Sequence, residues 1–303
     1  MPASDSGLSR PYGWLADALR LCRTHAALFL VAASAVLLIS LLPALLQRIA
    51  ATVLPTTLFI QAGIFVLFSV LLLPPVSGGF YRLVDAAQRG RAVHAWQIFE
   101  VLGDGPASAR LVLVNLVFLL LLVLGVIMPV AAIGGQPLAE WLRLMLTLQP
   151  GATAFPPMPP GTGALFGGAL LVTLLVNTAK ELAMAQAALR DRPPLEAVAD
   201  GFRVALRHAG AFLLFYVPVF VLAVLGVFGL VLAAVVVGAV LSLVAAPLAY
   251  LVIMPVAVGA ALGYYALVYA FFYRAWRATL GAGGDDDAAA GAPPAAPTHG
   301  IEL

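Results

Sequence analysis

The stretch Leu71–Arg91, LLLPPVSGGFYRLVDAAQRGR, decides how the whole chain is interpreted. An apolar run meets two prolines and Ser-Gly-Gly, and a basic segment follows. Either a membrane helix breaks here around a polar site, or a helix leaves the bilayer here. Helix exit is favoured, because the 18 residues from Thr57 to Pro74 extend about 27 Å as a helix and nearly cross the hydrocarbon core.

Composition places the chain in a membrane. Of its 303 residues, 63% are hydrophobic and only 10% are charged, whereas soluble domains contain roughly 25% charged residues. A water-soluble fold could not bury so much apolar surface, so the bilayer is the expected solvent. The net charge of +2 gives no argument for nucleic-acid binding, and the single cysteine, Cys22, excludes an internal disulfide.

Six segments are apolar over the roughly 20 residues that a spanning helix needs. They predict an all-α integral membrane protein with a six-helix transmembrane domain over residues 25–280. An N-terminal segment, residues 1–24, precedes this domain, and residues 281–303 have the composition of a disordered tail. The predicted spans lie near 25–47, 57–84, 108–133, 163–189, 209–238 and 245–277.

Arginine placement predicts the orientation. Fourteen of the sixteen Lys and Arg residues fall on one side of the predicted spans, and only Arg48 and Arg143 fall on the other. Because cytoplasmic loops are enriched in Lys and Arg, both termini are expected in the cytoplasm. The alanine-, glycine-, proline- and arginine-rich composition suggests a multi-pass protein of a bacterial inner membrane.

Short amphipathic helices are expected beside the spans. On the cytoplasmic side, Val93, Trp96, Ile98 and Phe99 could face the membrane, and apolar residues recur at helical spacing from 193 to 208. The latter residues are Leu195, Val198, Phe202 and Leu206. On the other side, residues 137–149 predict one interfacial helix with Trp141 at headgroup depth.

A weak internal repeat has an offset of 101 residues. Residues 86–91, AAQRGR, resemble residues 187–192, AALRDR, and VLGV recurs at 123–126 and 224–227. Either the chain contains a duplication or similar composition has arisen twice. The repeat aligns Pro74–Gly79 with Leu175–Lys180.

Two sets of residues are candidate sites. Ionisable residues inside a membrane are functional suspects, and a proline break frees backbone acceptors, so a polar intramembrane site is one hypothesis. Its residues are Pro74, Gly78, Gly79, Asn177, Thr178, Lys180 and Glu181. The alternative is that the prolines and glycines serve helix exit and packing, and that Lys180 extends to the surface. Contacts with anionic headgroups are the second hypothesis, through Arg89, Arg91, Arg190 and Arg192.

No pattern in the sequence predicts catalysis. The four histidines are dispersed and no pair has the spacing of metal ligands, so neither a metal nor a cofactor is expected. Phosphate-binding loops, nucleophile elbows and paired catalytic carboxylates are all missing from the sequence. We therefore do not expect an enzyme.

A resemblance to a known family rests on weak, largely apolar motifs. Trp14 precedes the first span, and a Gly-Arg turn and an aromatic segment ending in Phe99 follow the second. The motif at the end of the second span consists of Pro75, Gly78, Gly79, Phe80, Tyr81 and Arg82. In these features the chain resembles bacterial inner-membrane proteins of the YciC-like type, which are similar to the membrane domain of some glycerophosphodiester phosphodiesterases. No phosphodiesterase residues are present, and residues 137–162 and the acidic tail depart from the family.

Two function classes remain open. The first is a non-enzymatic scaffold or accessory factor that binds membrane lipids, including anionic headgroups, or a membrane-protein partner. The alternative is a transporter or channel for a small neutral or amphipathic solute, because the few buried polar residues argue against a charged one. The sequence favours the first class over the second.

Overall fold

The computed structural model describes residues 10–53, 58–147, 156–217, 229 and 246–281, and every regular element in these ranges is helical. Residues 209–217 are helical as well. The elements are α1 (Arg10–Thr24), α2 (Ala26–Val53), α3 (Leu58–Phe65), the π-helix η1 (Val66–Leu72), α4 (Leu73–Gln88), the 3-10 helix η2 (Ala95–Phe99), α5 (Glu100–Gly103), α6 (Gly105–Leu122), the π-helix η3 (Val123–Ile127), α7 (Met128–Thr147), α8 (Thr162–Arg190), α9 (Pro194–Arg207), α11 (Ala246–Trp276) and the π-helix η4 (Arg277–Gly281).

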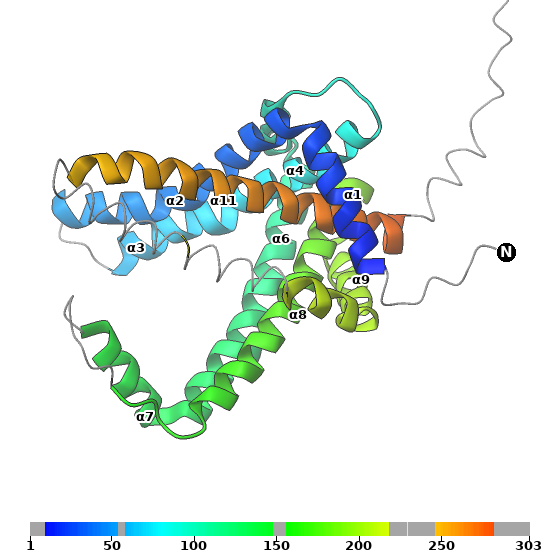
Figure 1. The fold of residues 1–303 in the computed structure, drawn as a ribbon. Coiled ribbons are helices and arrows are strands. Elements are labelled where there is room, and N and C mark those ends of the chain that lie inside the picture. The colour runs from blue at the N-terminus through cyan, green and yellow to red at the C-terminus, as the bar shows by residue number, and fades with distance from the viewer. Residues whose placement is uncertain (1–9, 54–57, 148–155, 218–228, 230–245, 282–303) are drawn as a thin grey trace, which may run out of the picture.

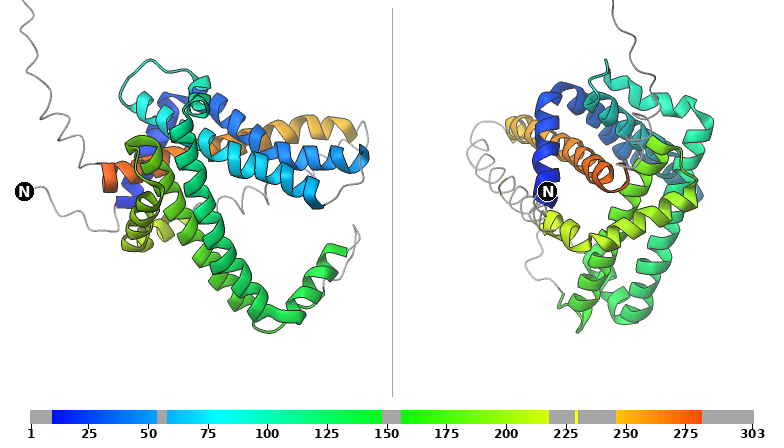
Figure 2. Two further views of the ribbon diagram at one scale, coloured as in Figure 1. Left: turned by 180° about the vertical axis from the view of Figure 1, so that it is seen from behind. Right: turned by 90° about the vertical axis from the view of Figure 1, so that its right-hand side faces the viewer.

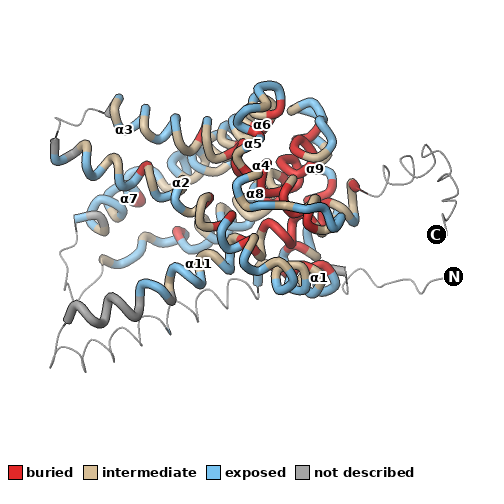
Figure 3. The backbone as a smooth tube through the Cα atoms, turned by 90° about the horizontal axis from the view of Figure 1, so that it is seen from above, coloured by how far each residue is buried: buried red, intermediate tan, exposed pale blue. Residues whose placement is uncertain are grey.

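The helices form two arms that diverge from a common base. One arm contains α2, α3 and α11, and the other contains α6 and α8, which run side by side (Figure 1). At the base, α1 crosses the C-terminal part of α11, and α9 packs on α8 (Figure 2). Buried residues concentrate at the base, whereas the arms are mostly exposed or intermediate (Figure 3). Apolar arms without a protein core suit a lipid environment.

Within the described residues, four helical stretches are long and apolar enough to cross a membrane. They are Ala26–Ala50, Phe59–Gln88, Gly105–Met145 and Thr162–Arg190, which correspond to the first four predicted spans. Most of the fifth predicted span, 209–238, lies outside the described residues, and the sixth corresponds to α11. An all-helical protein with several membrane-spanning candidates is therefore confirmed.

The prolines of the opening stretch do not end a helix. The chain passes from the π-helical turns of η1 directly into α4, with prolines in the first turn of α4, where a missing N–H is tolerated. Beyond them, Val76, Phe80 and Tyr81 are fully buried. The helix therefore continues through the prolines, with α4 reaching Gln88 as the central helix of the core, and the expected exit from the bilayer at this point stays a prediction.

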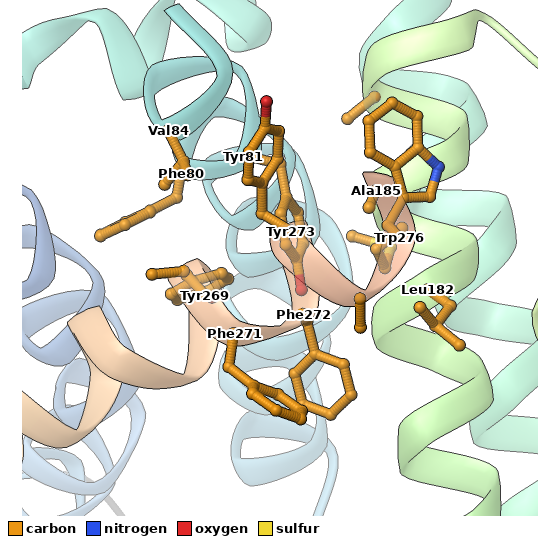
Figure 4. Close-up of a cluster of buried hydrophobic side chains, with 14 of the residues drawn as sticks. Phe80, Tyr81, Val84, Leu182, Ala185, Tyr269, Phe271, Phe272, Tyr273 and Trp276 are labelled. Carbon is orange, nitrogen blue, oxygen red and sulfur yellow. The ribbon is translucent and has the colours of Figure 1, made fainter. Parts of the chain in front are cut away.

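Aromatic side chains fill the space between α4 and α11. Phe80 stacks on Tyr269 with ring centroids 4.4 Å apart, and Tyr81 meets Tyr269 edge to face at 5.2 Å. Tyr273 and Trp276 continue the cluster toward α8 (Figure 4). Both Tyr273 and Trp276 are buried inside the protein, although aromatic residues beside arginines at the end of a span are typical of a membrane interface.

Two glycines of α4 permit close approach of neighbouring elements, as the packing interpretation predicts. A Cβ atom at Gly79 would collide with the backbone carbonyl of Ile98, and one at Gly78 would collide with the side chain of Leu111. The packing role of Gly78 and Gly79 is therefore confirmed.

The two expected amphipathic connections are helical, but only some of the apolar residues that were expected to face the membrane are exposed. In η2, Trp96 is 67% exposed, whereas Ile98 is buried beneath α4, and Val93 and Phe99 pack against the core. In α9, Leu195 and Leu206 are exposed, while Val198 is buried and Phe202 stacks on Phe118. Sequence spacing identified these helices without showing that the protein itself covers five of these eight apolar residues.

The expected interfacial helix over 137–149 is the second half of α7. Gly135 has a φ of +52°, so α7 bends sharply there and turns back toward the first arm (Figure 1). Trp141 donates a hydrogen bond from Nε1 to the Pro156 carbonyl (3.2 Å), which fixes the chain after the bend. Residues 148 and 149 lie outside the described residues.

The N-terminal segment contains a helix that packs on the rest of the protein. Residues 10–24 of the predicted N-terminal segment form the amphipathic helix α1, which the sequence interpretation did not assign. Trp14 and Ala18 of α1 are buried in the base. The tail that was expected to be disordered lies outside the described residues apart from Gly281.

Candidate functional site

A polar cavity of about 150 Å³ lies where α2, α4, α6, α8 and α11 converge. It contains three of the predicted polar-site residues, Pro74, Lys180 and Glu181. Its full lining is Val36, Ser40, Leu73, Pro74, Ser77, Asn115, Lys180, Glu181, Met184, Tyr265 and Tyr269. We refer to it as the central cavity.

A carboxylate in the wall of the central cavity is held from two sides. The Tyr81 hydroxyl donates a hydrogen bond to Glu181 Oε2 (2.8 Å), and Lys180 Nζ lies 3.8 Å from Glu181 Oε1. The Glu181 side chain is only 15% exposed. Because a buried charge is costly without a partner, this ion pair and hydrogen bond are needed to keep the carboxylate there. The pair leaves the cavity polar without a net charge.

Hydroxyl groups also line the central cavity. The Tyr269 hydroxyl donates to Ser77 Oγ (2.8 Å), and Ser40 Oγ donates to the Val36 carbonyl (2.8 Å). Ser77 lies one turn after the prolines of α4, so the proline-containing turn presents a hydroxyl to the cavity.

The π-helical turn next to the cavity frees one backbone acceptor. The Leu73 N–H bonds to the Phe68 carbonyl, five residues back. The same register would pair Pro74 with the Ser69 carbonyl, but Pro74 has no N–H. Asn115 Nδ2 lies 3.5 Å from that carbonyl and makes a long hydrogen bond to it. The π-turn therefore explains why an asparagine lies in the apolar helix α6.

The other predicted polar-site residues lie elsewhere. Asn177 lines a separate cavity of about 140 Å³, which shares Asn115 and Lys180 with the central cavity. Thr178 is hydrogen-bonded to the Tyr216 hydroxyl (3.0 Å) beside an apolar cavity of about 250 Å³. Gly78 packs against Leu111 and Gly79 packs against Ile98, and neither glycine lines the central cavity.

Several residues of the central cavity were missed from the sequence. Asn115 carried a usable signal, because a lone amide inside an apolar span is unusual. Tyr269 packs against Phe80 and Tyr81 and also lines the central cavity. Nothing in the sequence could have paired Tyr81 with Glu181, since 100 residues separate them.

The four predicted headgroup contacts are largely engaged within the protein. Arg89 forms an ion pair with Asp85 (2.9 Å), and Arg192 forms one with Glu196 (3.1 Å). The Arg190 guanidinium lies 5.9 Å from the Trp276 ring centroid and donates to the Gly281 carbonyl. Arg91 lines a mixed-charge cavity of about 430 Å³ that also contains Arg82 and three carboxylates.

The charged residues at the base join its elements. Arg110 forms an ion pair with Asp191, and Arg82 forms one with Asp104 (3.4 Å) and donates from Nε to the Ala188 carbonyl (3.0 Å). A hydrogen bond from the Ala107 N–H, together with the nearby Arg82, lowers the pKa of Asp104. These arginines hold the ends of α4, α6 and α8 together, which is a structural role.

No cysteine or metal chemistry is indicated in the described part of the chain. Burial raises the pKa of the Cys22 thiol to about 11, and its Sγ donates to the Ala266 carbonyl (3.6 Å), so the thiol stays protonated. No group of three or more His, Cys, Asp or Glu side chains within the described residues is arranged to hold a metal ion.

No protein-family model, no curated protein and no solved structure matches the chain. The resemblance to the YciC-like proteins therefore stays a prediction.

Proposed function

We propose that the protein binds a small neutral or amphipathic solute in the central cavity and carries it across a bacterial inner membrane, with six spans and both termini in the cytoplasm. The observation that supports this proposal is the convergence of Ser77, Glu181 and Tyr269 on one cavity between apolar helices. Polar groups inside a membrane bundle are costly, and they mark substrate pathways in known membrane proteins. Three of the four arginines on which the scaffold alternative relied, Arg89, Arg190 and Arg192, also contact protein partners, so they do not single out the headgroup alternative.

The size and charge of the central cavity limit the ligand. About 150 Å³ is smaller than the roughly 300–1,000 Å³ of sites for drug-sized ligands. A hydroxyl- or amide-bearing solute, or the polar end of an amphipathic molecule, would fit. Because Lys180 and Glu181 neutralise each other, a ligand with a net charge would have to displace one of them. No group in the cavity is arranged as a nucleophile with its base, so we propose binding without catalysis.

Solute flux into proteoliposomes tests the proposal. Glycerol and urea serve as neutral probes, with entry followed by stopped-flow light scattering. The wild-type protein should accelerate the entry of at least one probe, and Tyr81→Phe, which removes the hydrogen bond to Glu181, should reduce this flux by about fivefold.

Tyr264→Phe is the matched control, because Tyr264 is half exposed and does not line the central cavity. It should leave the flux unchanged. Wild-type vesicles that behave like protein-free vesicles with both probes, or equal losses in the two variants, would contradict the proposal.

The scaffold alternative keeps one specific observation in its favour. On α9, the exposed apolar side chains Leu195 and Leu206 lie among exposed arginines. Such a surface suits the membrane interface.

A further inference from the structure

A second polar cavity lies at the base, between α1, α9 and η4. Its volume is about 450 Å³, which is within the range of ligand sites. It shares no residue with the central cavity. Its lining consists of Trp14, Arg203, Val204, Arg207, His208, Ala278, Thr279 and Leu280. We refer to it as the arginine pocket.

The ionisable groups that line the arginine pocket are basic. Arg203 uses one guanidinium nitrogen for an ion pair with Asp200 (2.9 Å), and its other N–H donors remain for a further acceptor. Within the described residues, Arg207 takes part in no ion pair. His208 adds a third nitrogen-bearing side chain, and no carboxylate lines the pocket. An anion would therefore be attracted, and among the ion pairs of the described residues, one joins a carboxylate, Asp200, to a lining arginine.

The floor of the arginine pocket is rigid. Trp14 is 8% exposed, and its ring contacts His208 edge to face (6.3 Å) and Phe212 (5.8 Å). These contacts fix α1 against the end of α9. Packed aromatic side chains therefore hold the end of α9 that carries the two arginines.

The surroundings favour a ligand at a membrane surface. Leu206, between the two arginines and 60% exposed, and Leu213, just beyond the pocket, present apolar surface. Helical residues 209–217 start directly after His208 with an apolar sequence, at the beginning of the fifth predicted span. Arginines at such a boundary lie at the depth of lipid headgroups.

We infer that the arginine pocket binds a phosphate-bearing anion through Arg203 and Arg207, with the phosphodiester of an anionic phospholipid as the favoured source. Guanidinium groups bind phosphate oxygens with paired, charge-assisted hydrogen bonds. A soluble phosphate could provide the same chemistry, and the experiment distinguishes the two sources.

The test is lipid retention measured by native mass spectrometry on the full chain in mild detergent. Phosphatidylglycerol is titrated against phosphatidylcholine, and inorganic phosphate is titrated in a separate series. The wild-type protein should prefer phosphatidylglycerol, and Arg203→Gln/Arg207→Gln should weaken its binding by about thirtyfold. Arg203→Lys/Arg207→Lys keeps the charge and should bind more tightly than the Gln pair.

Arg20→Gln/Arg23→Gln is the matched control, because both arginines are exposed at the same end of the molecule and the change in net charge is identical. It should change the affinity by less than about threefold. Thermal unfolding of each variant verifies the fold.

Arginine-dependent binding of inorganic phosphate without phosphatidylglycerol retention would uphold the anion site and assign it to a soluble ligand. Equal weakening in the Arg203/Arg207 pair and the control pair would overturn the inference, since it would indicate diffuse attraction. Wild-type protein that neither prefers phosphatidylglycerol nor binds phosphate would overturn it as well.

Discussion

An offset of 101 residues aligns segment 74–90 with segment 175–191. Each segment packs closely against the helical connection that follows it, but different residues allow the close approach. Each belongs to a long helix, each is followed by a short helical connection, and each ends in a left-handed residue. These residues are Gly90, with φ +68°, and Asp191, with φ +51°. The aligned positions thus share a left-handed backbone conformation, which is common directly after a helix, and the duplication and its alternative both stay open.

The difference lies in where the close approach is placed. In the first segment, Gly79 on the long helix accommodates the Ile98 carbonyl of the connection. In the second, Gly201 on the connection accommodates the Ala179 carbonyl of the long helix. One glycine at each crossing is enough, so the long helix α8 needs none there. Position 180, which aligns with Gly79, is consequently able to carry the lysine of the central cavity.

The largest expected effect comes from filling these crossings. Gly79→Ala and Gly201→Ala should each lower the free energy of unfolding by about 3 kcal/mol, because the obstructing atom belongs to the backbone and overpacked sites relax poorly. Gly78→Ala should cost less, since the flexible Leu111 side chain can move. Denaturant unfolding in detergent measures all three.

Gly168→Ala is the control for these crossings, because no atom lies within 4 Å of a Cβ built there. It should be neutral or stabilising by up to about 1 kcal/mol. If Gly201→Ala were as harmless as Gly168→Ala, the two crossings would not be equivalent.

An intermediate effect is expected at the two helix ends. Gly90→Ala should cost about 1 kcal/mol, because a Cβ is strained in the left-handed region. Asp191→Gly should change the free energy of unfolding by less than about 0.5 kcal/mol, since relief of backbone strain offsets the lost ion pair with Arg110. Thermal unfolding checks both changes, and a large loss in Asp191→Gly would show that the ion pair, not the backbone, matters there.

The smallest effect concerns the start of the helix after each connection. Asp104 caps α6 by accepting a hydrogen bond from the Ala107 N–H (3.1 Å), whereas His208 precedes helical residues 209–217. Because folding lowers the pKa of Asp104 below 3.8, its stabilisation is complete above pH 3.8 and is lost as the pH falls through the lowered value.

Asp104→Asn keeps an acceptor at the cap and removes this titration. The stability of the variant, followed by thermal unfolding at stepped pH, should therefore fall less on acidification than that of the wild type. Identical acid profiles would show that the cap does not depend on the charge.

The sequence by itself determined the features that depend on local composition. Apolar runs of sufficient length predicted the helices and the membrane environment, because a bilayer leaves helices as the natural solution for a spanning chain. Gly78 and Gly79 predicted close packing for the same local reason. Lys180 and Glu181 were recognisable as a candidate site because ionisable residues are rare inside spans.

Only the tertiary structure decided which faces are covered and which polar groups meet. Neighbouring helices bury Ile98, Tyr273 and Trp276, although the surrounding sequence of each residue is typical of a membrane interface. The contacts Tyr81–Glu181 and Tyr269–Ser77 join residues 100 and 192 positions apart. Periodicity along a chain reports which face of a helix is apolar, but lipid and protein are equally good partners for that face. The choice between them is made when the helices converge.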